Sequence, residues 1–186
     1  MNAKKIVLIG LSLVTAIVVC GLYAGDEKPA AGGNTSAVVV GTFDSRAVAV
    51  AYVRSGHWQQ KLQQMKRELD EAKAAGDANK VKEIEQWGPA QQKKAHLQGF
   101  GTADVSEIIE CIKDEIPAIA KEAGVDIIVS KWNVVYQGPS AKTVDITEKI
   151  VAPFNPDEKT LTIIRDLMTK TPVSQDVLEK MDHARD

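Results

Sequence analysis

Apolar residues recur at helical spacing through the middle of the chain. From residue 58 the spacing is 4-3-4-3, with polar and charged residues between, which places one narrow apolar stripe along a helix. The stripe consists of Trp58, Leu62, Met65, Leu69 and Ala72. Gly76 and Asp77 then predict a reversal of the chain, and Val81 and Ile84 begin a returning helix. The pattern therefore predicts a helical hairpin whose two helices pack through narrow stripes.

A second helical pattern is wider and more apolar, and it runs from about residue 103 to residue 123. Its width predicts a helix that is buried against strands. Pro117 should kink this helix, as Pro89 should bend the returning helix of the hairpin, because proline has no N–H and clashes with the preceding turn. Gly124 suits a left-handed C-terminal cap. Cys111 lies on this pattern and is predicted to be a small buried side chain.

Three short runs of β-branched and aromatic residues predict strands at 37–43, 125–129 and 134–136. Asp44 is a suitable N-cap for a helix over 46–53, and Asp145 with Glu148 predicts a capping box at a later helix start. Three short strands leave open edges, so we expect copies of the sheet to join in an oligomer. The candidate residues of the oligomer core are Val38, Val40, Ile127, Val129, Val134 and Tyr136.

The first 24 residues have the pattern of an export signal. Two lysines precede an uncharged apolar run over residues 6–24, and a polar segment follows. Cleavage after Ala24 is one prediction. The run is also long enough to stay as a membrane tether, and Cys20 at its end raises a lipoprotein alternative. Residues 25–36 contain three glycines, one proline and small or polar residues, which predict a flexible linker. We therefore expect a periplasmic protein that is either free or anchored in the inner membrane.

Composition and motifs argue against catalysis. With 186 residues and a net charge of −2, the chain predicts one modest domain and no nucleic-acid partner. His57, His96 and His183 form no metal-binding spacing, and the sequence contains neither a phosphate-binding glycine loop nor a serine elbow. We expect no catalytic, metal or cofactor site. After signal cleavage Cys111 would be the remaining cysteine, which excludes an internal disulfide.

The order of features over residues 125–148 resembles the C-terminal end of the Skp (OmpH-like) family of periplasmic chaperones. These features are a strand, a Trp132-Asn133 link, a strand ending in Val135-Tyr136, a polar loop and a helix start at Asp145. The resemblance covers roughly residues 38–151. It implies an α+β fold in which a small β-strand oligomerisation core carries a protruding α-helical hairpin, a coiled-coil-like arm over about 45–123, and assembles as a homotrimer.

The resemblance also implies a function. Members of that family are ATP-independent holdases that bind unfolded outer-membrane or periplasmic proteins between their arms. The candidate client contacts here are Trp58, Leu62, Met65, Leu69 and Trp87. Trp58 and Trp87 have two interpretations, as exposed grips for clients or as packing across the hairpin.

The chain departs from the family in three respects. An outgoing helix of about twenty residues would reach only ~30 Å, the charges of the arm are mixed in sign, and residues 155–186 extend past the domain at 37–154 as a helical extension. An alternative function is therefore a membrane-tethered structural or adaptor protein that uses its helical arm to bind one folded partner.

Overall fold

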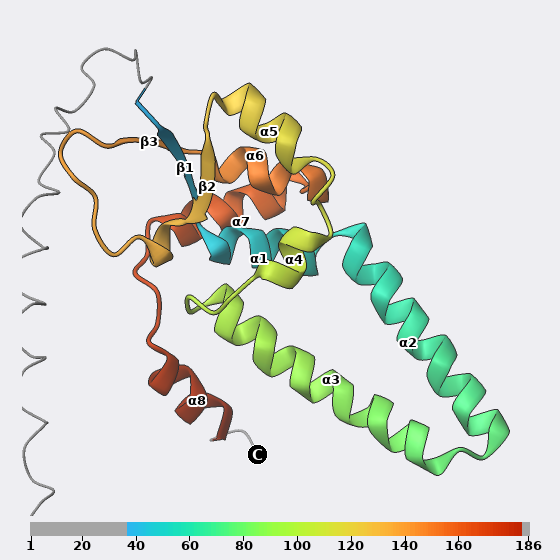
Figure 1. Cartoon of the computed structure of the whole chain (residues 1–186). Coiled ribbons are helices and arrows are strands. Elements are labelled where there is room, and N and C mark those ends of the chain that lie inside the picture. The colour runs from blue at the N-terminus through green and yellow to red at the C-terminus, as the bar shows by residue number, and fades with distance from the viewer. Residues whose placement is uncertain (1–36, 184–186) are drawn as a thin grey trace, which may run out of the picture. The chain divides into compact units, whose positions relative to one another are not determined.

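The computed structural model describes residues 37–183, without the side chains of residues 179 and 181–183 (Figure 1). The predicted signal, Cys20 and the linker lie outside the described residues. The described residues belong to one compact unit, a mixed α/β fold with a three-stranded parallel sheet and eight α-helices. Among them, none of the helices combines the length and the apolar character that a membrane crossing requires.

The sheet has the order β2-β1-β3, with β1 (Val39–Phe43) between β2 (Ile127–Ser130) and β3 (Lys142–Asp145). Both pairings are parallel, and Val40 lies opposite Ile127 on one side and Thr143 on the other. The chain between β1 and β2 carries five helices. Parallel strands need such crossover connections, so the sheet gathers three segments that are far apart in the sequence.

The third strand lies at residues 142–145, and its prediction at 134–136 is wrong. A 3₁₀ turn, η1 (Lys131–Asn133), ends β2 and turns the chain outward, which leaves Val135 fully exposed and Tyr136 81% exposed. The backbone of β1 pairs with Thr143 and Val144 instead. The predicted turn residues 137–140 thus precede the third strand rather than end it.

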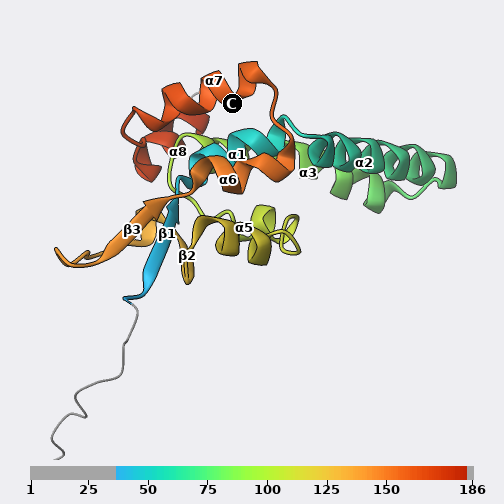
Figure 2. The same cartoon turned by 90° about the horizontal axis from the view of Figure 1, so that it is seen from above.

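The core lies around α1 (Ser45–Val53), whose Ala47, Val48, Ala49 and Ala51 are at most 2% exposed. Asp44 caps this helix as predicted, since its Oδ1 accepts the Arg46 N–H at 3.0 Å. Helices α6 (Thr147–Val151) and α7 (Glu158–Met168) pack on α1, with the turn η2 (Ala152–Phe154) between them. In Figure 2, α1 and α6 lie between α7 and the strands, so α7 shares the core of the sheet domain.

The capping box predicted at Asp145 and Glu148 does not form. Asp145 ends β3, and its Oδ1 accepts the backbone N–H and the hydroxyl of Thr147, at 2.9 and 2.6 Å. The helix therefore begins at Thr147, and the Glu148 carboxylate lies 3.7 Å from Arg165 on α7.

Helices α2 (Gly56–Ala75) and α3 (Ala78–Gly99) form the predicted pair, and Gly76 makes the reversal in the left-handed conformation (φ 70°). Figures 1 and 2 show both helices extending away from the sheet. A long hairpin arm is not evident in the described residues, because the segment predicted as arm, 45–123, is divided between this pair and the core helices. Pro89 does not interrupt α3, which continues through it to Gly99.

The single helix predicted over 103–123 is two helices, α4 (Ser106–Glu110) and α5 (Ile116–Ala123). Pro117 lies in the first turn of α5, where its missing N–H has no intrahelical partner to lose, so it starts a helix rather than kinking one. Cys111 lies in the break between the two helices and is exposed, so its predicted burial is wrong. Gly124 caps α5 with φ 65°, as predicted. The last helix is α8 (Gln175–His183).

Candidate functional site

The carboxyl ends of the strands meet at a buried charge cluster around Asp44. Arg46 donates to this carboxylate through Nη2 at 2.8 Å and Nε at 3.1 Å, and the two side chains are 1% and 0% exposed. Lys131, from the end of β2, places its Nζ 2.8 Å from Asp44 Oδ2. The indole N–H of Trp132 donates to Oδ1 at 3.2 Å. A single carboxylate therefore receives two cations and an indole donor.

These contacts join separate elements. Arg46 also donates to the carbonyl of Lys170, just after α7, and its guanidinium lies 4.9 Å from the centre of the Trp132 ring. The Asp44 N–H donates to Thr147 Oγ1 at 3.0 Å, which links the end of β1 to the start of α6. Because every charged group of the cluster has a partner, the arrangement is structural: it fixes the strand ends to the helices.

Electrostatics around Asp44 keep the carboxylate ionised. Burial by itself raises the pKa of a carboxyl group, but hydrogen bonds from Arg46 and Lys131 and the charge of Arg46 outweigh it. The pKa of Asp44 is lowered from 3.8 to about 2. This group is therefore charged at neutral pH.

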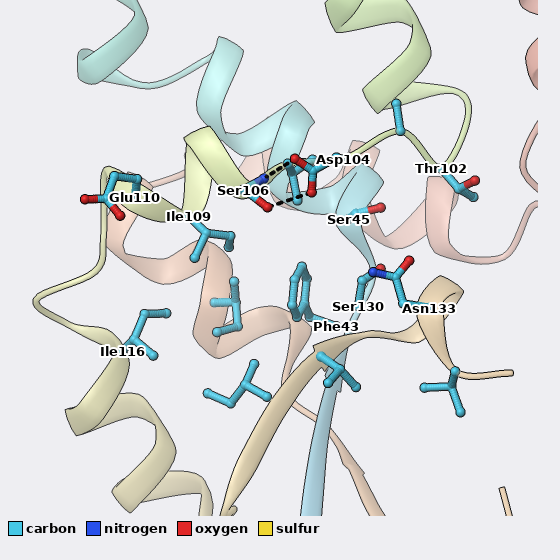
Figure 3. A pocket seen from close by; sticks show the side chains of 16 residues that line it. Phe43, Ser45, Thr102, Asp104, Ser106, Ile109, Glu110, Ile116, Ser130 and Asn133 are labelled. Carbon is cyan, nitrogen blue, oxygen red and sulfur yellow. Dashed lines mark hydrogen bonds between the residues drawn. The ribbon is translucent and has the colours of Figure 1, made fainter. Parts of the chain in front are cut away.

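A cavity of about 500 Å³ lies beside this cluster, between β1, β2, α4 and α5 (Figure 3). Its apolar lining includes Phe43, Ile109, Ile116, Ile128 and Ile150. The polar lining consists of Ser45, Thr102, Asp104, Ser106, Glu110, Ser130 and Asn133. In Figure 3 the ring of Phe43 lies in the middle of the lining side chains, and Ser45 lies above it and to the right. The volume is in the usual range for a small-molecule site.

The candidate client contacts mostly pack within the helix pair. Trp58 stacks on Trp87 with ring centroids 5.9 Å apart and planes 23° from parallel. Both indoles are half-buried, as are Met65 and Leu69. Leu62 is 38% exposed. The packing interpretation of the two tryptophans therefore describes their contacts in this structure.

The candidate oligomer residues lie on the outer face of the sheet and in the loop beside it. Gly41 and Phe43 point into the core, so Val40 and its register neighbour Ile127 point outward. Ile127 is 49% exposed and Val38 is 55% exposed. Val129 and Val134 line the cavity, while Tyr136 lies in the exposed loop. The structure therefore divides the six residues: Val38, Val40 and Ile127 are at the outer face of the sheet, Val129 and Val134 line the cavity, and Tyr136 is in the loop.

Sequence reasoning identified Asp44 as a helix cap and missed the charge cluster and the cavity. The signal that could have found them is the position of polar residues at strand ends. Asp44 follows β1, Lys131 follows β2 and Thr147 follows β3, and the carboxyl ends of parallel strands meet at one edge of the sheet. The parallel arrangement was not evident from the sequence, so these residues could not be brought together in advance.

Among the described residues, no group of three or more histidine, cysteine, aspartate or glutamate side chains is placed to hold a metal ion. His57 packs its ring against Phe154 at 5.8 Å. Cys111 is exposed, and partial burial and the nearby Glu107 and Glu110 raise the pKa of its thiol, which disfavours the reactive thiolate.

No protein-family model, characterised protein or solved structure matches the chain.

Proposed function

We propose that the chain is an exported, ATP-independent holdase-type chaperone, similar to the Skp (OmpH-like) family. In this proposal copies of the chain join through their sheets as a homotrimer and bind unfolded envelope or outer-membrane proteins. The proposal includes no enzymatic activity and no cofactor. The proposed export of the chain rests on the sequence, in which two lysines and an apolar run over residues 6–24 are typical of an export signal.

The observation that carries this proposal is the open apolar side of the sheet. Val40 and its register neighbour Ile127 lie on the face of the sheet opposite the core-facing Gly41 and Phe43, Ile127 is 49% exposed, and Val135 and Tyr136 in the following loop are 100% and 81% exposed. Contiguous exposed apolar groups of this kind mark interaction sites in soluble proteins. The surface therefore favours a protein that works by binding other chains or copies of itself.

The strand arrangement supports assembly. Strands β2 and β3 are the two edges of a three-stranded sheet, and each has only four residues. Open edges with unpaired N–H and C=O groups favour pairing with another chain. Joining copies through these edges would bury Ile127 and the exposed loop together, which is how an oligomer core would form.

The helix pair is the part of the chain that is proposed to bind clients. Helices α2 and α3 extend from the sheet and carry mixed charges with a few partly exposed apolar side chains such as Leu62. Weak contacts dispersed over such a surface suit unfolded chains, which offer many similar sites. In an oligomer several pairs would surround one client and add their contacts.

An aggregation assay with a client protein tests the holdase function. A membrane β-barrel protein is diluted from urea with and without an equimolar amount of the oligomer, and light scattering is followed without ATP. We expect the chain to slow the rise in scattering, whereas a folded control protein of similar size should not. An unchanged rise at several-fold excess of the chain would exclude this function.

One observation favours the alternative, a membrane-tethered adaptor. Trp58, Met65, Leu69 and Trp87 are half-buried within the helix pair, so few large apolar side chains on it are free to grip unfolded clients. A charged surface of fixed shape suits a single folded partner better than many unfolded ones. In this alternative residues 6–24 stay as an inner-membrane anchor.

The position of the mature N-terminus distinguishes the chaperone from the tethered adaptor. Mass spectrometry of the protein purified from a bacterial envelope reports whether the chain starts at Met1 or near Gly25. Cleavage near Ala24 with weak selectivity among unfolded clients favours the chaperone. An intact Met1 with saturable binding of one folded partner favours the adaptor.

A further inference from the structure

We infer that the cavity beside Ser45 binds a small uncharged amphiphile, a molecule with an apolar body and one hydroxyl or carbonyl oxygen. Val129 and Val134 line this cavity and are also candidate oligomer residues, but the inference goes beyond the holdase function and does not depend on it. It stands on the lining of the cavity, on an unpaired hydroxyl group and on the charges around it.

The unpaired hydroxyl belongs to Ser45. Its side chain is 2% exposed, and its Oγ is the single buried side-chain nitrogen or oxygen of the described residues that has no hydrogen-bond partner. Leaving such a group unpaired costs about 1–3 kcal/mol. Ser45 lines the cavity, as Figure 3 shows, but its Oγ is covered in this rotamer, so a rotation about χ1 would have to turn the hydroxyl toward a ligand oxygen.

The apolar residues of the cavity lining indicate that most of the ligand is apolar. Phe43, Ile128 and Ile150 come from the strands and α6, and Ile109 and Ile116 from α4 and α5. These side chains form an apolar wall on several sides of a space of about 500 Å³. A cavity of this size with an apolar wall of this kind suits a compact alkyl or single-ring group.

The charge of the ligand follows from what surrounds the cavity. Asp104 and Glu110 line it, and no lysine, arginine or histidine among the described residues does. Of the cations beside the lining residues, Arg46 and Lys131 are held by Asp44, and Lys113 is paired with Glu110. The start of α1 is also occupied, because the Asp44 carboxylate accepts the Arg46 N–H and the Asp44 carbonyl accepts the Ala47 N–H. An anion would therefore meet acidic groups and no partner.

Isoleucine-methyl NMR on the full chain, with octanol as the probe, tests this site. We expect the methyl signals of Ile109, Ile116, Ile128 and Ile150 to shift on titration. Ile84 on α3 and Ile163 on α7 lie outside the cavity and should not shift. Octanoate has the same chain length but is ionised at neutral pH, and it should bind at least tenfold more weakly.

Two variants and a control assign the contacts. Ser45→Ala should weaken octanol binding by about 3–10-fold, the equivalent of one neutral hydrogen bond, and it removes an unpaired group, so folding should not suffer. Ile116→Trp should abolish binding by filling the cavity. Ser140→Ala changes an exposed loop residue and should bind like the unaltered chain.

Several results would overturn the inference. These are no shift at saturating octanol, equal binding of octanoate, equal binding by Ser45→Ala, and shifts that spread to Ile84 and Ile163. If dilution alone moves the same four methyl signals, the cavity is filled by a second copy of the chain, and the small-molecule site is likewise excluded.

Discussion

Asp44 and Arg46, two residues apart in the chain, form an ion pair that is closed off from solvent. The Arg46 Nη2 lies 2.8 Å from Asp44 Oδ2, and the side chains are 1% and 0% exposed. Lys131 and Trp132 reach the same carboxylate from the end of β2. The pair therefore joins the central strand, its neighbour and α1 at the edge of the sheet that borders the cavity.

Asp44→Asn should destabilise the protein by about 3–5 kcal/mol, because it leaves two cations near a group that no longer compensates them. Asparagine keeps the shape of the side chain and can still cap α1, so the change isolates the charge. Urea unfolding followed by circular dichroism measures the loss. Asp166→Asn is the matched control: its ion pair with Lys170 is exposed, so the change should be within about 0.5 kcal/mol. A loss below about 1 kcal/mol for Asp44→Asn would contradict a cluster that holds the fold.

The free energy of unfolding should fall in acid, and part of this fall should come from the protonation of Asp44. Its pKa in the folded protein, about 2, lies below the ordinary value of 3.8, so the folded state binds the proton less readily. This contribution is fully present above about pH 5 and is lost as the pH falls toward 2, and it amounts to roughly 2 kcal/mol. Urea titrations between pH 7 and about pH 2 measure it, and the same titrations on Asp44→Asn should show a smaller fall. Parallel curves for the two proteins would mean that other carboxyl groups cause the acid loss.

Two glycine-to-alanine changes should have opposite effects. A Cβ at Gly41 would lie 2.8 Å from Ile146 Cδ1 and 3.1 Å from Val125 Cγ2. Gly41→Ala should therefore destabilise by about 1–3 kcal/mol through overpacking. Gly88 lies in α3 with open space around it, so Gly88→Ala should stabilise by up to about 1 kcal/mol. Chemical unfolding of both variants gives the comparison, and equal stability of Gly41→Ala and the unaltered chain would argue against α6 packing closely on β1.

The stack of Trp58 on Trp87 should hold the start of α2 against the middle of α3. Trp87→Ala removes a half-buried indole and one ring pair, and we expect a loss of roughly 2 kcal/mol. Leu62→Ala, at a 38% exposed position, should lose less than about 1 kcal/mol. Amide hydrogen exchange localises the effect, with faster exchange in α2 and α3 and little change in β1. Unchanged exchange in Trp87→Ala would show that the indoles do not hold the pair.

The local elements of this fold were more predictable than their assembly. Asp44, Gly76 and Gly124 act through their own backbone neighbours, so their capping roles follow directly from the sequence. The third strand was misplaced because Val134–Tyr136 has the β-branched and aromatic residues of a strand, whereas pairing with β1 depends on where η1 turns the chain. Strand propensity describes a fit to a half-buried surface, and it does not identify the partner.

The same limit applies to the site. Arg46 and Lys131 are 85 positions apart in the sequence, and their meeting at Asp44 depends on the parallel sheet. Cys111 was misplaced because its apolar neighbours suggested an unbroken helix, while the chain breaks between α4 and α5 and turns the thiol outward. The open face of the sheet was predictable from Val40 and Ile127, since alternation along a strand needs no knowledge of the partner strand.

The solution mass of the purified chain tests the central claim most directly, because the helix pairs can surround a client only in an oligomer, and the oligomer is proposed to assemble through the sheet. Light scattering after size exclusion is run on the chain alone and with a membrane β-barrel protein diluted from urea, and then on Ile127→Lys, a change at a 49% exposed position. The account predicts a trimer of the unaltered chain, at three times the mass of one chain (20.1 kDa for all 186 residues), that co-elutes with the client, and a lower mass for Ile127→Lys. A monomer that ignores the client would contradict both the assembly and the holdase, and would leave the tethered adaptor as the better account.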